Sequence, residues 1–90
     1  METINLKNGI VIVNDSYNAN PTSMRVAIEN FAKIFYNNRK ILVLGDMLEL
    51  GNFEIAEHKK IGEFIKTNKY ADSVLTVGDL AKHITAQSGG

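Results

Sequence analysis

The sequence contains no cysteine, which excludes disulfide bonds and thiolate metal sites and agrees with a reducing compartment. It also has no excess charge of either sign, because ten basic residues balance ten acidic ones. Without a basic field to hold a polyanion, nucleic acid is not an expected partner. No window is apolar for the length of a membrane span, and residues 1–9 lack a basic segment followed by an apolar one. We therefore expect a cytoplasmic protein without a membrane partner.

What the sequence does contain is typical of one small folded domain. Its 90 residues are 44% hydrophobic and 22% charged, as in ordinary globular domains and unlike disordered chains. No internal repeat or low-complexity tract interrupts it. We expect residues 1–90 to form a single domain with a small core.

The stretch from Ile10 to Pro21, IVIVNDSYNANP, organises the rest of the chain. Its first four residues are consecutive β-branched apolar side chains, which predict a central strand covered on both faces. Asn8-Gly9, just before it, predicts a tight hairpin with a short strand over 4–7. Polar, turn-forming residues end the strand, and Asn20-Pro21 then has the pattern of an N-cap and a first helical residue.

Helix and strand patterns alternate along the remainder. Apolar side chains at spacings of three and four predict a core-facing helix of about four turns that ends near Asn37-Asn38; they are Met24, Ala27, Ile28, Phe31, Ala32 and Phe35. A buried strand follows over 41–44, and a third strand is expected over 73–77, before a short helix that Asp79 caps. Between these strands a helix from 52–54 to about 67 carries one inner face, formed by Ile55, His58, Ile61, Gly62 and Ile65.

This order of elements predicts the fold class. It indicates an α/β fold, a Rossmann-like three-layer fragment of helix, sheet and helix with a short parallel sheet, preceded by a β-hairpin. Complete sheets of this kind have about five or six strands, so three parallel strands indicate a truncated domain whose last strand leaves an exposed edge. Ligands of such sheets bind outside the carboxyl ends of the strands. We therefore expect Asp15, Tyr17, Asn18 and Asn20 to project toward one site.

A second polar loop, GDMLELGNF, begins at Gly45 after the second buried strand. Gly45 and Gly51 permit backbone geometries that other residues resist. Between them stand two carboxylates, Asp46 and Glu49. The loop is thus a second candidate for ligand contacts.

Each of these side chains also has a purely structural interpretation. Asp15 is more often an ordinary turn residue, and Asn20 more often an N-cap, than a ligand contact. Asp46 and Glu49 would more often be solvated loop carboxylates. His58, on an apolar stripe, is more often a half-buried structural histidine than a catalytic base.

Two motifs carry a family resemblance. The first is DSYNANP at 15–21, followed by Ser23-Met24; the second is LGDMLELG at 44–51, followed by Glu57-His58 and Val77-Gly78. Together they resemble the C-terminal domain of the Mur ligase family. The resemblance covers most of the chain but only the first part of that domain, which is the last of the family's three. Two motifs in the right order, with helix patterns between them, are more specific than either alone.

The resemblance implies part of an ATP-dependent amide ligase of peptidoglycan synthesis. In the members with the most similar motifs, ATP with Mg²⁺ phosphorylates a carboxylate of a UDP-N-acetylmuramoyl tripeptide, and the amine of D-alanyl-D-alanine attacks the acyl phosphate. The C-terminal domain closes over the nucleotide and brings the acceptor, while the phosphate-binding loop and metal ligands belong to the central domain. This sequence has no GxxxxGK loop followed by Ser or Thr. We therefore expect the chain alone to be catalytically inactive, without a metal site or a tightly bound cofactor.

On the nucleotide side, the resemblance implies roles for Asp15, Tyr17, Asn18 and Asn20. Asp15 matches the family aspartate that meets the ribose, and a carboxylate is suited to accept hydrogen bonds from two sugar hydroxyls. Tyr17 stands where some relatives carry a lysine near the terminal phosphate, so that role does not transfer. Asn18 and Asn20 match polar positions that border the nucleotide.

On the acceptor side, Asp46, Glu49 and His58 fall in motifs where carboxylates could orient an ammonium group before attack. This assignment is our hypothesis rather than a family role. The basic residues that lie later in the family's domain are not in this chain, which leaves recognition of the acceptor carboxylate unassigned.

Two other function classes stay open. A phosphorelay receiver-like domain also alternates strands and helices, but it needs an acidic pair after its first strand, where Asn14-Asp15 offers one acid. A non-catalytic binding or structural module would show an exposed apolar edge and no nucleotide binding. Fold similarity alone does not choose among these classes, and the paired motifs favour the ligase.

Overall fold

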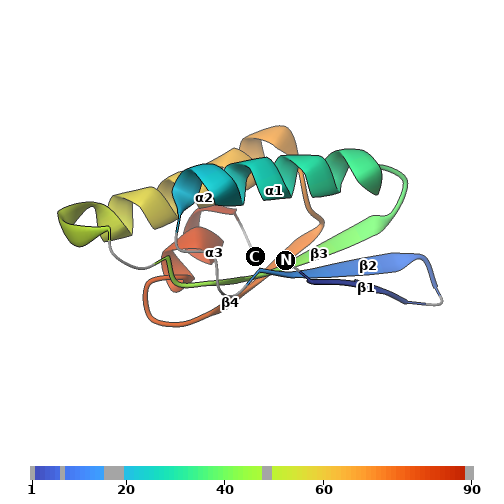
Figure 1. The fold of residues 1–90 in the computed structure, drawn as a ribbon, viewed down its shortest axis with the longest axis horizontal. Helices are drawn as coiled ribbons and strands as arrows, with labels where there is room; N and C mark the ends of the chain where they lie inside the picture. The colour runs from blue at the N-terminus through green and yellow to red at the C-terminus, as the bar shows by residue number, and fades with distance from the viewer. Residues whose placement is uncertain (1, 7, 16–19, 48–49, 89–90) are drawn as a thin grey trace.

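The computed structural model describes residues 2–6, 8–15, 20–47 and 50–88. Their elements, in chain order, are β1 (Glu2–Asn5), β2 (Ile10–Asp15), α1 (Pro21–Ile34), β3 (Arg39–Gly45), the 3₁₀ turn η1 (Gly51–Phe53), α2 (Glu54–Asn68), β4 (Ser73–Val77) and α3 (Lys82–Ser88). The strands form one sheet in the order β1-β2-β3-β4 (Figure 1). β1 pairs antiparallel with β2, whereas β2, β3 and β4 run parallel. The predicted α/β fold with a hairpin before a short parallel sheet is confirmed.

The hairpin turns at the predicted Asn8-Gly9 pair. Gly9 has φ +82°, a conformation that glycine adopts without steric cost. The Gly9 N–H donates to the Leu6 carbonyl at 3.2 Å, and the Leu6 N–H donates to the Ile10 carbonyl at 2.9 Å. The turn returns the chain as β2, which lies between β1 and β3 as expected of a central strand.

The first helix begins as its sequence predicts. The Asn20 Oδ1 accepts hydrogen bonds from the N–H of Thr22 at 2.8 Å and of Ser23 at 3.2 Å. Pro21 is the first helical residue, where the missing N–H of proline costs nothing. The helix buries Met24, Ile28 and Phe31, but it ends at Ile34, three residues before the expected Asn37.

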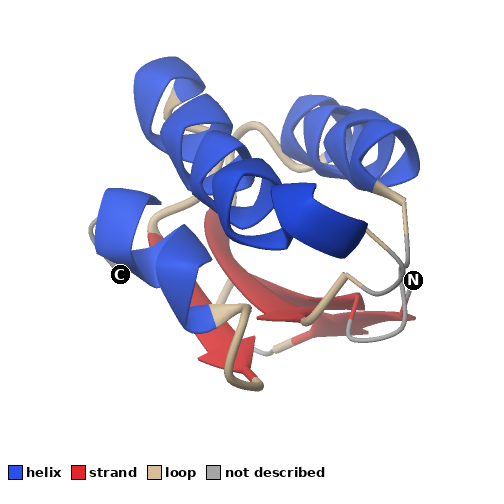
Figure 2. Ribbon diagram, turned by 90° about the vertical axis from the view of Figure 1, so that its left-hand side faces the viewer, coloured by secondary structure: helices blue, strands red, loops and turns tan. Residues whose placement is uncertain are grey.

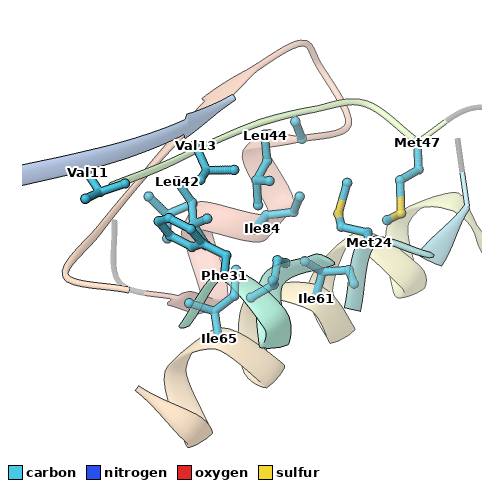
Figure 3. Close-up of a cluster of buried hydrophobic side chains, with 13 residues drawn as sticks. Val11, Val13, Met24, Phe31, Leu42, Leu44, Met47, Ile61, Ile65 and Ile84 are labelled. Atoms are coloured by element: carbon cyan, nitrogen blue, oxygen red, sulfur yellow. The ribbon is translucent and has the colours of Figure 1, made fainter. Parts of the chain in front are cut away.

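The core lies between one face of the sheet and all three described helices (Figure 2). Figure 3 shows side chains of β2 and β3, such as Val13 and Leu42, meeting those of the helices, such as Phe31 and Ile84. The described residues thus form two layers, not the expected helix–sheet–helix arrangement, and β2 is covered on one face only. Right-handed crossovers between strands that follow one another in sheet order place successive helices on the same face. The strand order here never reverses, so the helices stay together.

The second helix follows the predicted bounds and most of the predicted face. His58, Ile61, Gly62 and Ile65 are buried, but Ile55 is 45% exposed. Ile55 lies in the first turn of α2, which extends past the strands in Figure 1. The periodicity of a helix does not reveal where its neighbours end. No helix in the described part of the chain is long and apolar enough to cross a membrane.

Gly62 lets α2 and α3 approach closely. A Cβ at this position would collide with the Ile84 carbonyl oxygen and would lie 2.8 Å from the Gln87 Cβ. Backbone atoms cannot swing aside as the end of a side chain can. The contact between the two helices therefore depends on the missing side chain of Gly62.

We predict that Gly62→Ala destabilises the chain by about 1–3 kcal/mol, because overpacking forces the helices apart. The sign of the change in stability is informative, because the same substitution in an unconstrained helix stabilises by about 1 kcal/mol. Urea unfolding followed by circular dichroism measures the effect. Thr67→Ala, an exposed change in the same helix, is the control and should stay within about 0.5 kcal/mol of wild type. A stabilised Gly62→Ala variant would contradict the close approach.

Candidate functional site

The described ends of both motifs lie at the carboxyl edge of the parallel sheet. In the register of the strands, Asp15 at the end of β2 lies opposite Leu44 of β3, and Gly45 lies opposite Val77 of β4. The loops that follow the three strands therefore leave from neighbouring points. This is the edge at which open α/β sheets bind ligands.

The structure describes part of the predicted nucleotide side. Asp15 is the last residue of β2, while its side chain and the whole of Tyr17 and Asn18 lie outside the described residues. Asn20 is the N-cap of α1, which confirms its structural interpretation. The nucleotide roles of all four residues stay predictions.

On the predicted acceptor side, Asp46 joins two loops of this edge. Its Oδ1 accepts hydrogen bonds from the N–H of Leu80 at 3.0 Å and of Ala81 at 2.6 Å. These donors lie in the turn that leads into α3, 34 and 35 residues further along the chain. Hydrogen bonds to a charged acceptor are about twice as strong as neutral ones. Asp46 thus accepts the hydrogen bonds of the backbone amides that precede α3. The sequence had suggested this capping role for Asp79.

The second motif explains the glycine that follows β4. Gly78 has φ +119°, and a Cβ there would collide with the Asp46 carboxylate. The absence of a side chain lets this carboxylate reach Leu80 and Ala81. Gly78, which is part of the second family motif, is therefore also in close contact with Asp46 of the same motif.

His58 fastens the same loop to α2. The ring is fully buried, at 0% exposed. Its Nε2 accepts the Met47 N–H at 2.8 Å, and its Nδ1 lies 2.5 Å from the Glu54 carbonyl oxygen. Because a carbonyl only accepts and a backbone amide only donates, these partners assign the proton to Nδ1 and leave Nε2 unprotonated. His58 is a neutral ring with both nitrogens engaged by the backbone.

Asp46 and Met47 are therefore held from several sides. The Asp46 carboxylate joins the turn before α3, the Met47 amide joins His58, and the Met47 side chain is buried. Figure 3 shows Met47 directed toward Met24 at the end of the core. Glu49, two residues further on, lies outside the described residues, and its acceptor-side role stays a prediction.

Sequence reasoning found the residues at this edge but not their connections. No spacing rule relates Asp46 to Leu80 and Ala81, because the contact depends on how β3 and β4 pair. The one available signal was Gly78, a glycine directly after a strand. In the described part of the chain, no three His, Asp or Glu side chains are grouped so that they could hold a metal ion.

Comparison with known proteins identifies the family. The family model described as "Mur ligase, glutamate ligase domain" matches residues 1–89. The chain therefore belongs to the Mur ligase family. A Bacillus subtilis (strain 168) protein named UDP-N-acetylmuramoyl-tripeptide--D-alanyl-D-alanine ligase is 45% identical over 84 residues, which cover 93% of this chain. Proteins of the same name from Buchnera aphidicola subsp. Baizongia pistaciae (strain Bp) and Escherichia coli (strain K12) are 41% and 38% identical, over 98% and 96% of this chain. The chain spans 18% of the length of each of these relatives.

We predict that Asp46→Ala lowers the free energy of unfolding by about 1–3 kcal/mol, because it leaves the amides of Leu80 and Ala81 without their acceptor. Asp46→Asn keeps an uncharged acceptor and should lose roughly half as much. Urea unfolding of both variants measures the difference. Asp79→Ala is the matched control, and a loss equal to that of Asp46→Ala would assign the cap to Asp79 instead.

We predict that His58→Leu exposes the Met47 amide to solvent exchange and destabilises the chain by about 2 kcal/mol, since the change removes the acceptor of that amide. Hydrogen exchange followed by NMR should show Met47 exchanging at least about tenfold faster than in wild type. His83→Leu removes the other histidine of the chain and should leave the Met47 rate unchanged. An unaltered rate in His58→Leu would contradict the hydrogen bond to Met47.

Proposed function

We propose that this chain is the nucleotide-closing part of an ATP-dependent amide ligase that adds D-alanyl-D-alanine to a UDP-N-acetylmuramoyl tripeptide. Its membership of the Mur ligase family, and the names of relatives that align with nearly all of it, support this proposal. The observation that carries it is the position of the described ends of both family motifs at one edge of the sheet. The chain spans 18% of the length of those relatives, so we propose that it is inactive alone.

On the nucleotide side, Asp15 accepts hydrogen bonds from the ribose hydroxyls, and Tyr17, Asn18 and Asn20 border the nucleotide. The support for this assignment is the place of these residues in the chain, between a strand and a helix. β2 ends at Asp15, and α1 begins directly after Asn20, so the segment between them spans a strand end and a helix start. Such junctions suit nucleotides because both strand ends and helix N-termini present polar groups. ATP supplies the phosphoryl group that activates the carboxylate, and Mg²⁺ accompanies its phosphates.

On the acceptor side, Glu49 orients the ammonium group of the incoming D-alanyl-D-alanine. Asp46 and His58 serve this side by holding the backbone that leads to Glu49. Both have their polar atoms engaged with backbone groups in the structure, which supports positioning more than direct chemistry. His58 in particular already accepts the Met47 amide at Nε2, where a general base would need to receive a proton.

We propose a location in the bacterial cytoplasm, where ATP and UDP-linked precursors are available to the proposed activity. By supplying peptidoglycan precursors, such a ligase serves cell-wall biogenesis and with it cell shape and division. Neither nucleic acid nor membrane is a partner in this function.

The proposal predicts that Mg-ADP binds weakly to the segment around Asp15. In a backbone amide NMR titration at millimolar ligand, shifts should concentrate between Asp15 and Asn20 and disappear in Asp15→Ala. Asp79→Ala is the matched control, because it removes an exposed carboxylate beyond β4 and should leave the shifts intact. The free energy of unfolding of each variant is first compared with that of the wild type. This separates loss of binding from loss of structure.

Other results would contradict the nucleotide assignment. Shifts that survive in Asp15→Ala, or that occur far from the carboxyl edge, would place the nucleotide elsewhere. Absence of any shift at millimolar ligand would favour a non-catalytic module. Gain of one phosphoryl group after incubation with acetyl phosphate would favour a receiver-like domain.

A further inference from the structure

Glu57, in the first turn of α2, belongs to the second family motif but has no role in the proposed function. Its carboxylate takes part in two ion pairs. Oε2 lies 3.5 Å from the Nη2 of Arg25 in α1, and Oε1 lies 3.3 Å from the Nζ of Lys60 in α2. The second pair stays within one helix, whereas the first connects two helices. Glu57 therefore joins the start of α2 to the helix with which the first motif ends.

The start of α2 depends on a small number of contacts. In the described part of the chain, residues 51–56 are all exposed, and the N-cap residue Phe53 forms no side-chain capping hydrogen bond. Glu57 is partly buried and His58 is fully buried. The position of this first turn is therefore set largely by the contacts of these two side chains.

The two side chains act on the same loop, the one that follows β3. The His58 ring moves with α2, because its Nδ1 is bonded to the carbonyl of Glu54 in the same helix. Its Nε2 accepts the Met47 N–H at 2.8 Å. A shift of the first turn would carry the ring away from Met47, and hydrogen bonds weaken steeply when their geometry is lost. The ion pair between Arg25 and Glu57 opposes such a shift.

A buried contact joins the same parts of the molecule. Met24, the neighbour of Arg25, and Met47 are both 0% exposed and belong to one core cluster. Figure 3 shows the two methionines directed toward each other. Thus α1 meets the loop through Met24 and meets α2 through Arg25, while α2 meets the loop through His58. Each of the three parts is held by the other two.

We propose that Arg25 and Glu57 are positioning residues for the loop after β3, the proposed acceptor side. They act through His58, which holds the Met47 amide, and neither needs to touch a substrate. The ion pair thereby couples this loop to the helix that follows the proposed nucleotide side. The inference rests on the proposed function for the roles of the two sides, whereas the coupling itself is a property of the chain without ligand.

Amide hydrogen exchange of the 90-residue chain, followed by NMR without nucleotide, tests the proposal. Arg25→Ala and Glu57→Gln should each speed exchange of the Met47 amide about two- to fivefold, as suits a partly exposed ion pair. The amide of Leu42, in a central strand, reports global unfolding and should change less. Because no nucleotide is present, this test can fail or succeed independently of the Mg-ADP titration.

Two other lysine ion pairs supply matched controls. Lys33 pairs with Glu29 within α1, and Lys60 pairs with Glu57 within α2. Lys33→Ala and Lys60→Ala therefore each remove an ion pair that connects no separate elements. Both variants should leave the Met47 exchange rate unchanged.

Reversing both charges separates the ion pair from the helix dipole. Glu57 is an acidic residue in the first turn of α2, where negative charge is favourable by itself. Arg25→Glu and Glu57→Arg should each speed Met47 exchange, and the double variant, which restores the pair but not the dipole interaction, should recover most of the wild-type protection. An unchanged Met47 rate in Arg25→Ala, equal acceleration of Met47 and Leu42, or no recovery in the double variant would overturn the proposal.

Discussion

The hydrogen bonds from Leu80 and Ala81 to the Asp46 carboxylate join the loop after β3 to the turn that leads into α3. Asp46 follows β3, and its two donors follow β4. The contact requires that β3 and β4 be paired in register, that Gly78 carry no side chain, and that α3 begin where it does. In turn it fixes the position of α3 and of the turn before it, which place Ile84 and Ala81, respectively, in the core. One charged group thus couples the sheet edge to the third helix.

This coupling changes how the second family motif is understood. A sequence that places carboxylates in a glycine-bounded loop suggests ligand contacts, and such loops often provide them. Here the first carboxylate of the loop is engaged with backbone amides, and the neighbouring amide of Met47 is engaged with His58. The described part of the motif, Asp46 and Met47, therefore builds the edge, and the ligand contact proposed for Glu49 does not extend to them. A strongly recognisable motif need not be made of ligand-binding residues throughout.

The sequence predicted those features that depend on local chemistry. Consecutive β-branched residues marked β2, Asn8-Gly9 marked the hairpin, and Asn20-Pro21 marked the start of α1. Prediction failed where the answer depended on a distant neighbour. Ile55 continues the apolar stripe of α2 but extends past the sheet, and the cap expected from Asp79 comes from Asp46. Local patterns also could not predict which face of the sheet the helices cover, because this depends on the order in which the strands pair.

The β2 strand carries apolar side chains on both of its faces. Val11 and Val13 on one face form the core with the helices, while Ile10 and Ile12 lie on the opposite face of the strand. Asn14 continues this second face to the residue directly before Asp15. Asn14 lies opposite Val43 of β3, so this second face of β2 continues to the point where the first motif leaves the sheet. The end of β2 therefore supports both the second face of the sheet and the carboxyl edge.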